Sequence, residues 1–289
     1  MLPPGRPSVY PQIAMANRIK IGDLDVLVVS DGTLFVPPTT YYRGTTDDDW
    51  QRHTRWLNHD GNLEFSMACF LVRSGDRRVL IDTGLGANKL WDYQGGRLLP
   101  ELAEAGVQPE DVDTVFVTHL HVDHCGTCTV PDGGALKPAF PNATYRWTAP
   151  EHSFWQGIES HRGSSFSIHD LLDTLEDRYQ PAGDGATIAP GISVIATPGH
   201  TPGHAGIVLS SGTERAFILG DAISCPAQLE EPEWSGLGDM DRELARRSQE
   251  AVAREAEDTG ALLATAHFPG LAFGRVLRGA GKRYWQPVS

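Results

Sequence analysis

Short apolar runs separated by turn residues recur along the chain and predict strands in both halves. In the first half the runs are residues 24–29, 68–72, 78–81 and 114–117. In the second half they are residues 192–196, 205–209, 216–219 and 262–265. Short runs of apolar and β-branched side chains, bounded by Gly, Asp or Ser, are typical of strands that are buried in a sheet.

Helical periodicity appears between these strands. Residues 47–57 and 98–105 carry apolar positions at helical spacing, and Gly106 follows the second segment as a C-terminal cap would. A longer helix is expected over about residues 239–258, and residues 150–179 indicate helices inserted between the two halves. Strand-rich halves with flanking helices predict an α/β fold, a four-layer αββα sandwich of two mixed sheets with helices outside.

The pattern predicts an N-terminal arm, residues 1–18, followed by a single domain, residues 19–289. The arm is rich in Pro and has no periodic pattern, so we expect it to lie on the surface or on a partner subunit. In the rest of the chain Pro and Gly residues stand at turns throughout, and no linker divides it. A chain of 289 residues is long enough to bury a substantial core.

Charge narrows the range of partners. The chain has 24 Lys and Arg against 37 Asp and Glu, a net charge of -13, and the resulting field repels phosphate backbones and anionic lipids. Neither nucleic acid nor a membrane is therefore expected as a partner. No apolar stretch approaches the roughly 20 residues that span a bilayer, and the arm lacks the apolar core of a secretory signal. These features predict a cytoplasmic protein.

The cysteines are too few and too irregularly spaced for a disulfide framework. They are Cys69, Cys125, Cys128 and Cys225. Cys125 and Cys128 form a CxxC motif, but there is no second CxxC to complete a zinc site. We therefore interpret the motif as a coincidence of spacing and expect reduced thiols.

The densest cluster of potential metal ligands directly follows the strand predicted at residues 114–117. It consists of His119, His121, Asp123 and His124. Imidazole nitrogens with carboxylate oxygens suit zinc, and also iron or manganese, whereas structural zinc sites usually include thiolates. The cluster therefore predicts a metal site with a catalytic role.

Written as HxHxDH, this cluster resembles the signature of the metallo-β-lactamase superfamily. Four further segments are similar to other motifs of that family: LIDTG at 80–84, TPGHTPGH at 197–204, LGD at 219–221 and AHFPG at 266–270. Each coincides with or follows a predicted strand, in the family's order. The motifs together extend over most of the chain.

The resemblance implies two metal positions with a shared carboxylate. His119, His121 and His200 would hold the first ion, Asp123, His124 and His267 the second, and Asp221 would bridge them. It implies two Zn²⁺ per chain, with iron or manganese as alternatives, and a bridging hydroxide as the nucleophile. Asp221 and Asp123 are the expected catalytic carboxylates, Asp123 as a proton donor to the leaving oxygen. Asp82 and His204 are expected to support the ligands without binding metal.

Within the superfamily, the chain most resembles N-acyl homoserine lactonases and methyl parathion hydrolase. This likeness implies a metal-dependent hydrolase with a small-molecule substrate, namely a small, largely apolar lactone or ester that it opens. An organophosphate or phosphotriester hydrolase is the alternative, because both reactions use the same dinuclear chemistry. A mononuclear iron thiol dioxygenase is an alternative of another reaction class. Lactonase-like relatives are often dimers, so a homodimer is also an expectation.

The ligands do not specify the substrate, so residues of the pocket must. The candidates for an apolar wall are Phe154, Trp155, Phe166, Trp234, Phe268 and Leu271. A hydrogen-bond donor is also expected beside the metals to stabilise a developing oxyanion, and Tyr42 and Tyr93 are examples of residues that could supply it.

Overall fold

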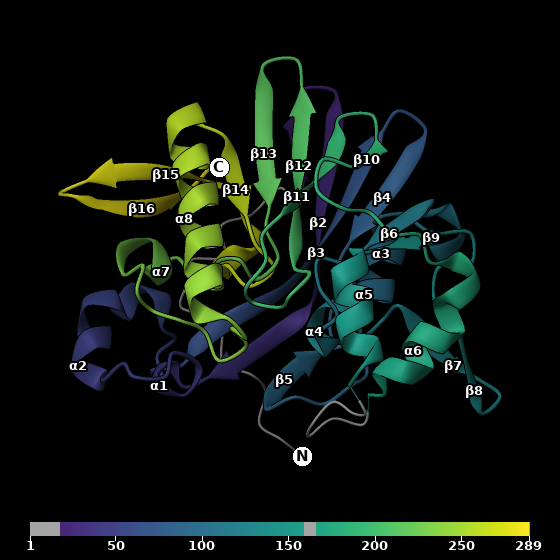
Figure 1. Cartoon of the computed structure of the whole chain (residues 1–289), viewed down its shortest axis with the longest axis horizontal. Coiled ribbons are helices and arrows are strands. Elements are labelled where there is room, and N and C mark those ends of the chain that lie inside the picture. Colours follow the sequence, from purple (N-terminus) through teal and green to yellow (C-terminus); the bar gives the residue numbers. More distant parts are fainter. Residues whose placement is uncertain (1–17, 159–165, 289) are drawn as a thin grey trace.

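In the computed structural model, which describes residues 18–158 and 166–288, two sheets pack face to face between outer helices (Figure 1). The predicted arm lies outside the described residues, apart from Arg18 at the start of the first strand. The αββα sandwich predicted from the sequence is confirmed.

The first sheet has seven strands in the order β1-β2-β3-β4-β6-β9, with β5 also paired to β2. They are β1 (Arg18–Ile21), β2 (Leu24–Val36), β3 (Leu63–Ser74), β4 (Arg77–Ile81), β5 (Asp92–Gly95), β6 (Thr114–Phe116) and β9 (Thr144–Arg146). The pairs β4–β6 and β6–β9 are parallel and the others antiparallel, so the sheet is mixed.

The second sheet also has seven strands, in the order β10 to β16. They are β10 (Thr187–Ala189), β11 (Ile192–Ala196), β12 (Ala205–Ser211), β13 (Glu214–Ile218), β14 (Leu262–Ala264), β15 (Gly274–Gly279) and β16 (Lys282–Pro287). Only the pair β13–β14 is parallel within this sheet. A separate hairpin joins β7 (Thr129–Asp132) to β8 (Ala135–Pro138).

The longer helices cover the two outer faces (Figure 1). The first sheet is covered by α3 (Leu98–Glu104), α5 (Ala149–Gln156) and α6 (Ile168–Leu175), and the second by α8 (Arg242–Thr259). The short helices are α1 (Pro38–Tyr41), α2 (Asp47–Trp50), α4 (Val122–Cys125) and α7 (Ala227–Glu230). Single 3₁₀ turns or short 3₁₀ helices are η1 (Gln51–Trp56), η2 (Pro109–Asp111), η3 (Glu176–Arg178) and η4 (Pro269–Leu271).

Alternating side chains of the strands form the layers of the core. In β3, Phe70 points between the sheets toward the cluster that contains Ile207, whereas Leu71 points outward to the cluster that contains Leu171 of α6. In β13, Phe217 packs outward with the apolar residues of α8. Successive residues of a strand face opposite sides of the sheet, so each central strand contributes to two apolar layers at once.

All eight predicted strands are present, although several boundaries differ. The helix predicted at residues 47–57 is one turn of α-helix continued by 3₁₀ helix. Helix α8 begins at Arg242 rather than near residue 239, because Asp241 caps it by accepting a hydrogen bond from the Leu244 amide. Among the helices of the described residues, none has the length and apolar character of a membrane span.

The CxxC cysteines are buried free thiols, not a redox pair. The Cys125 thiol donates to the His121 carbonyl at 3.2 Å, and the Cys128 sulfur lies 3.4 Å from the Thr83 hydroxyl. Burial raises the pKa of both thiols, that of Cys128 to about 12. Because thiols with a raised pKa form little reactive thiolate at neutral pH, their role is packing behind the histidine loop.

Candidate metal centre

The predicted ligands meet at one end of the sandwich, where β6, β11, β13 and β14 end. His119 and His121 lie in the loop after β6, and the single turn of α4 folds Asp123 and His124 back toward the same place. His200, Asp221 and His267 follow β11, β13 and β14. Loops at strand ends carry these side chains, and the packed sheets beneath hold the loops in position.

Three imidazoles form the first potential ligand group. His119 Nε2 lies 2.9 Å from His121 Nδ1, and His200 Nε2 lies 3.0 Å from the same His121 atom. The ring nitrogens therefore converge on one point, and the three residues form a group that could hold a metal ion.

Asp123, His124 and His267 form a second group of this kind. His267 Nε2 lies 3.5 Å from Asp123 Oδ2, and His124 Nε2 lies 3.9 Å from that oxygen. These two groups are the ones that the family resemblance implies. A third group, His119, His124 and Asp221, combines one residue of each with the expected bridging carboxylate.

Asp221 lies between the two groups and presents one oxygen to each. Its Oδ1 is 3.3 Å from His124 Nε2 and 3.1 Å from His267 Nε2, whereas its Oδ2 is 3.3 Å from His200 Nε2. A carboxylate in this arrangement can bridge two cations.

The buried polar atoms of the site fit bound metal ions. His124 Nε2 and Asp221 Oδ1 are buried and make no hydrogen bond within the described part of the chain. Buried polar atoms are normally satisfied, and ring nitrogens that face each other at about 3 Å are satisfied together by a cation. The donor set of imidazoles and carboxylates suits zinc, with iron or manganese as alternatives.

Electrostatics favour positive charge at the centre. Burial raises the pKa of Asp221, but the charges of His267 and His124 outweigh it and hold the pKa well below its usual value. Burial lowers the pKa of His124, yet Asp221 and then Asp82 raise it well above its usual value. The Asp221 carboxylate therefore stays ionised and attracts a cation.

Asp82 holds His124 in place, as the family resemblance implied. Its Oδ2 accepts from His124 Nδ1 at 2.9 Å, which leaves Nε2 directed at the centre. The same carboxylate accepts from the Thr118 amide at 2.8 Å and the Thr118 hydroxyl at 3.0 Å. Asp82 adopts a left-handed backbone conformation, φ 58°, which is strained for a residue with a side chain.

His204 uses both ring nitrogens within the protein. Its Nε2 accepts from the Asp221 amide at 3.0 Å, and its Nδ1 lies 3.1 Å from the Thr197 carbonyl, to which it can donate. Burial lowers the pKa of His204 to about 3, which keeps the ring neutral. Because both ring nitrogens of His204 have partners within the protein, His200 is the histidine of the TPGHTPGH motif that is available as a metal ligand.

Two supports of the ligands were not identified from the sequence. Asp239 Oδ1 lies 2.9 Å from His200 Nδ1, and the Ser66 carbonyl lies 2.9 Å from His267 Nδ1. Asp239 precedes α8 outside any motif, and a carbonyl carries no side-chain signal, so the sequence offers nothing that would single out either residue.

A cavity of about 170 Å³ opens beside the potential ligands. It is lined by His121, Asp123, His200, Asp221 and His267 together with Leu34, Tyr41, Phe65, Leu90, Trp91, Val122, Leu237 and Gly238. A Cβ atom on Gly238 would lie 2.4 Å from His200 Cε1, so only glycine permits this approach of the backbone to the ring.

None of the six residues predicted to form the apolar wall of the substrate pocket lines this cavity, so that prediction is wrong for the cavity beside the potential ligands. Phe154, Trp155 and Phe166 belong to the outer core of the first sheet, with the Trp155 ring 5.6 Å from the back of His121. The other three pack elsewhere: Trp234 beside Trp50, Phe268 against Trp285, and Leu271 against the core between the sheets. The core and the cavity draw on the same apolar residue types, so residue type does not separate them.

The tyrosine beside the cavity is Tyr41, not the examples considered from the sequence. The Tyr42 hydroxyl donates to Gln228 Oε1 at 2.9 Å, and the Tyr93 hydroxyl donates to the Asp31 carbonyl at 3.0 Å. Tyr41 lines the cavity, with its hydroxyl 2.9 Å from Ser224 Oγ. Burial and then the charge of Asp221 raise the pKa of Tyr41 well above its usual value, so it remains a hydrogen-bond donor.

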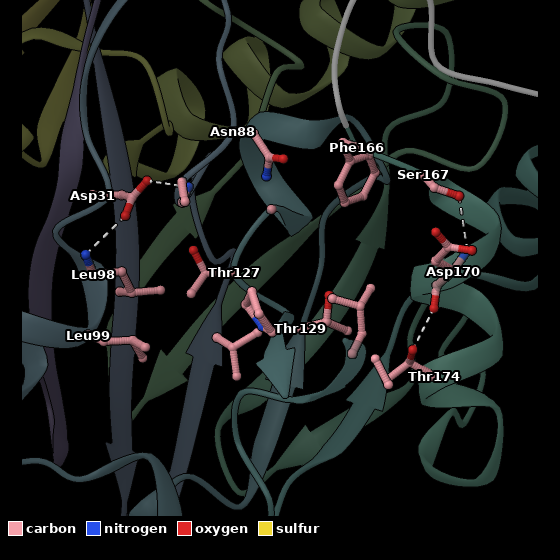
Figure 2. A pocket seen from close by; sticks show the side chains of 18 of the residues that line it. Asp31, Asn88, Leu98, Leu99, Thr127, Thr129, Phe166, Ser167, Asp170 and Thr174 are labelled. Atoms are coloured by element: carbon pink, nitrogen blue, oxygen red, sulfur yellow. Dashed lines mark hydrogen bonds between the residues drawn. The ribbon is translucent and has the colours of Figure 1, made fainter. Parts of the chain in front are cut away.

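A larger cavity, about 1070 Å³, lies between α3, the β7–β8 hairpin and α6 (Figure 2). Phe166 lines it, as do Asp31 and Asn88, and Asp31 accepts from the Leu98 amide at 2.9 Å. None of the predicted ligands is among the described residues that line it. The larger volume of this cavity therefore does not identify it as the candidate reaction site, because the potential ligands lie beside the smaller cavity.

Two sheets between helices, with histidine and aspartate groups at their loop end, are an arrangement that this chain shares with metal-dependent hydrolases. Residues 64–267 match the Metallo-beta-lactamase superfamily model, and the chain belongs to that superfamily.

Relatives and solved structures of the same fold include lactonases and other hydrolases. An N-acyl homoserine lactonase from Bacillus sp is 25% identical over 214 residues, 67% of this chain and 79% of the relative. The structure of AidC, a dizinc quorum-quenching lactonase, has a TM-score of 0.83 at 26% identity and covers 94% of this chain and 97% of its own. The hydrolase AbOPH has a TM-score of 0.77 at 28% identity, with the same coverage of both chains.

Proposed function

We propose that this protein is a dinuclear metal-dependent lactonase that opens small acylated lactones, with N-acyl homoserine lactones as the substrate class. The lactonase relatives support the reaction and the acylated ring, and the dizinc neighbour supports two ions. The carboxylate of Asp221 between two ligand groups supports a bridged pair of ions.

The cavity beside the ligands is the observation that carries this proposal. Five potential ligands occupy one part of its lining, and Leu34, Phe65, Leu90, Trp91 and Leu237 form an apolar part. A substrate with a polar lactone ring and an apolar acyl chain matches such a cavity, because the ring would lie beside the potential ligands and the chain against the apolar side chains.

Two metal ions held by these groups would supply a water of lowered pKa and polarise the substrate carbonyl. The protein's part in the reaction is to orient the lactone and to handle its protons. Hydrolysis adds water to the carbonyl carbon and breaks the ring C–O bond, and the ring oxygen leaves as a hydroxyl.

Asp123 and Tyr41 are the residues that serve these steps. Asp123 lines the cavity, and its Oδ2 lies 3.5 Å from His267 Nε2. There the carboxylate can take the proton of the attacking water and deliver it to the ring oxygen. The Tyr41 hydroxyl can donate to the carbonyl oxygen as negative charge develops there.

The acyl chain would lie against the apolar part of the cavity. Trp91 is 53% exposed, lies directly before β5 and has a left-handed backbone conformation, φ 43°. Strained backbone conformations cluster at functional sites, so Trp91 is the candidate contact for the acyl chain.

A substrate panel tests the proposal. The zinc-loaded protein would be assayed with N-hexanoyl homoserine lactone, an aryl ester and a phosphotriester by a pH indicator, and with a thiol substrate by oxygen uptake. We expect the highest kcat/KM for the lactone. Asp221→Ala should abolish turnover, whereas Asp60→Ala, which removes an exposed carboxylate, should not change it.

Other outcomes would redirect the assignment. Preferential turnover of the phosphotriester would replace lactones as the substrate class while keeping the dinuclear centre. Oxygen uptake by an iron-loaded protein without hydrolysis would contradict the proposal altogether.

A further inference from the structure

Glu151 is a completely buried carboxylate that no motif of the chain includes. It lies in the first turn of α5, outside the cavity, and accepts four hydrogen bonds. Its Oε1 accepts from the Leu120 amide at 2.8 Å and from Trp155 Nε1 at 2.6 Å. Its Oε2 accepts from the Thr201 hydroxyl at 2.6 Å and from the Gly203 amide at 3.0 Å.

Three of these donors belong to two different metal-site loops, and the fourth, Trp155, lies in α5 itself. Leu120 stands between His119 and His121, whereas Thr201 and Gly203 directly follow His200. One carboxylate therefore joins the two segments that carry the first ligand group.

The rest of the α5 turn reinforces this connection. The Thr148 hydroxyl donates to the Gly203 carbonyl at 2.6 Å and accepts from the Glu151 amide at 3.2 Å. A Cβ atom on Gly203 would lie 2.1 Å from the Glu151 amide nitrogen, so glycine is needed where the loop meets the helix. Trp155, one turn later in α5, packs its ring against that of His121.

Burying a carboxylate costs free energy unless its charge is well compensated. The four donors to Glu151 are all neutral: two amides, a hydroxyl and an indole. An apolar side chain would fill the same space without that cost, but it would leave the Leu120 and Gly203 amides without these partners. The carboxylate thus fixes the geometry of the two loops.

We propose that Glu151 is a positioning residue that sets the distance between the His119–His121 loop and His200, and thereby the metal affinity of the first ligand group. This inference rests on the dinuclear centre of the proposed function. It assigns α5 a part in the site, although α5 provides no metal ligand.

Glu151→Gln tests the proposal. An amide keeps one acceptor oxygen, but its NH₂ group faces either the Leu120 amide or the Gly203 amide, neither of which can accept. The variant and the wild type would be titrated with Zn²⁺ against a competing chelator. We expect the affinity of one of the two ions to fall 10- to 100-fold, as is usual when a support of a ligand is lost, and that of the other to stay within threefold.

Reference variants identify which ion is affected. His121→Ala removes a ligand of the first group and His267→Ala one of the second, so their isotherms define each loss. The Glu151→Gln isotherm should resemble that of His121→Ala. Glu230→Gln is the matched control, because Glu230 is also a buried carboxylate but pairs with Arg55, away from both groups. It should bind both ions as the wild type does.

Unchanged affinity for both ions in Glu151→Gln would overturn the proposal, as would a loss confined to the second ion. If the variant does not fold, Thr201→Val replaces it, since it removes one of the four donors without placing a new polar group. That variant should weaken the first ion severalfold, and wild-type affinity would overturn the proposal. The readout is zinc binding, so a wild type that binds two ions but hydrolyses no lactone would refute only the proposed function.

Discussion

Asp239 Oδ1 lies 2.9 Å from Nδ1 of His200, so the other ring nitrogen of His200 faces His121 and Asp221. A carboxylate at Nδ1 holds the proton there and leaves Nε2 free to bind a cation. Asp239 is fixed in turn, because its Oδ2 accepts from the Ser235 hydroxyl at 2.8 Å and the Gly236 amide at 2.7 Å.

Asp239→Asn should weaken metal binding at the first group about 10- to 100-fold. An asparagine can keep an oxygen toward His200 only by turning its NH₂ group toward the Gly236 amide, which cannot accept. Zinc titration against a chelator measures the effect. Asp258→Asn, an exposed change on α8, is the control and should bind zinc as the wild type does. Equal affinity in both variants would mean that Asp239 does not orient His200.

Tyr41→Phe should lower kcat for lactone hydrolysis by about 10²-fold, with little change in KM, because a donor to a developing oxyanion acts mainly in the transition state. Tyr42→Phe is a close control. Its hydroxyl is also buried but bonds to Gln228, and it does not line the cavity. Steady-state kinetics that show the same kcat for Tyr41→Phe and the wild type would exclude Tyr41 as the donor.

Trp91→Ala should raise KM more for a decanoyl than for a butanoyl homoserine lactone, since each buried methylene group contributes about 0.8 kcal/mol of binding. The kcat values should change little. Leu277→Ala removes another exposed apolar side chain, on β15 away from the cavity, and should leave both KM values unchanged. An equal rise in KM for both chain lengths would indicate that Trp91 does not contact the acyl chain.

His53 makes stability depend on pH. It is buried in η1, and its Nε2 lies 3.3 Å from Glu231 Oε1. Burial lowers the pKa of His53 below the usual 6.5, although the charge of Glu230 acts in the opposite direction. The unfolded chain therefore takes up a proton as pH falls through about 6.5, whereas the folded chain does so only at lower pH. The free energy of unfolding should fall with pH in this window, with a contribution from His53 of at most about 1.4 kcal/mol per pH unit.

Chemical denaturation of the zinc-loaded protein at several pH values between 7 and 5 measures this slope. The slope should be shallower for His53→Gln than for the wild type. His59→Gln, which alters an exposed histidine, should have the same slope as the wild type. A His53→Gln slope as steep as that of the wild type would refute this origin of the pH dependence.

The grouping of the potential metal ligands could be predicted from the sequence because these residues follow strand ends at recognisable motifs. HxHxDH places four polar side chains directly after an apolar strand, and His200, Asp221 and His267 each stand three or four residues beyond another strand. In such segments the position of the strand end determines where the ligand side chain lies. The strand pattern and the motifs together therefore predict most of the arrangement of the potential ligands.

The cavity could not be predicted in the same way. Its apolar part comes from β2, β3, the segment before β5 and the segment before α8, which only the tertiary structure brings together. Phe65 and Phe268 are both nearly fully buried aromatic residues, yet one lines the cavity and the other packs against Trp285. The roles of Glu151 and Asp239 could not be predicted for a related reason, because each side chain contacts loops that are distant from it in the sequence.

Metal content per chain tests the central claim most directly. The protein would be purified without added metal, saturated with Zn²⁺, desalted and measured by elemental analysis beside Asp221→Ala and Asp60→Ala. The account predicts about two zinc ions in the wild type and in Asp60→Ala, and a loss of zinc in Asp221→Ala, whose bridging carboxylate is gone. One ion in the wild type, or unchanged zinc in Asp221→Ala, would contradict a dinuclear centre bridged by Asp221.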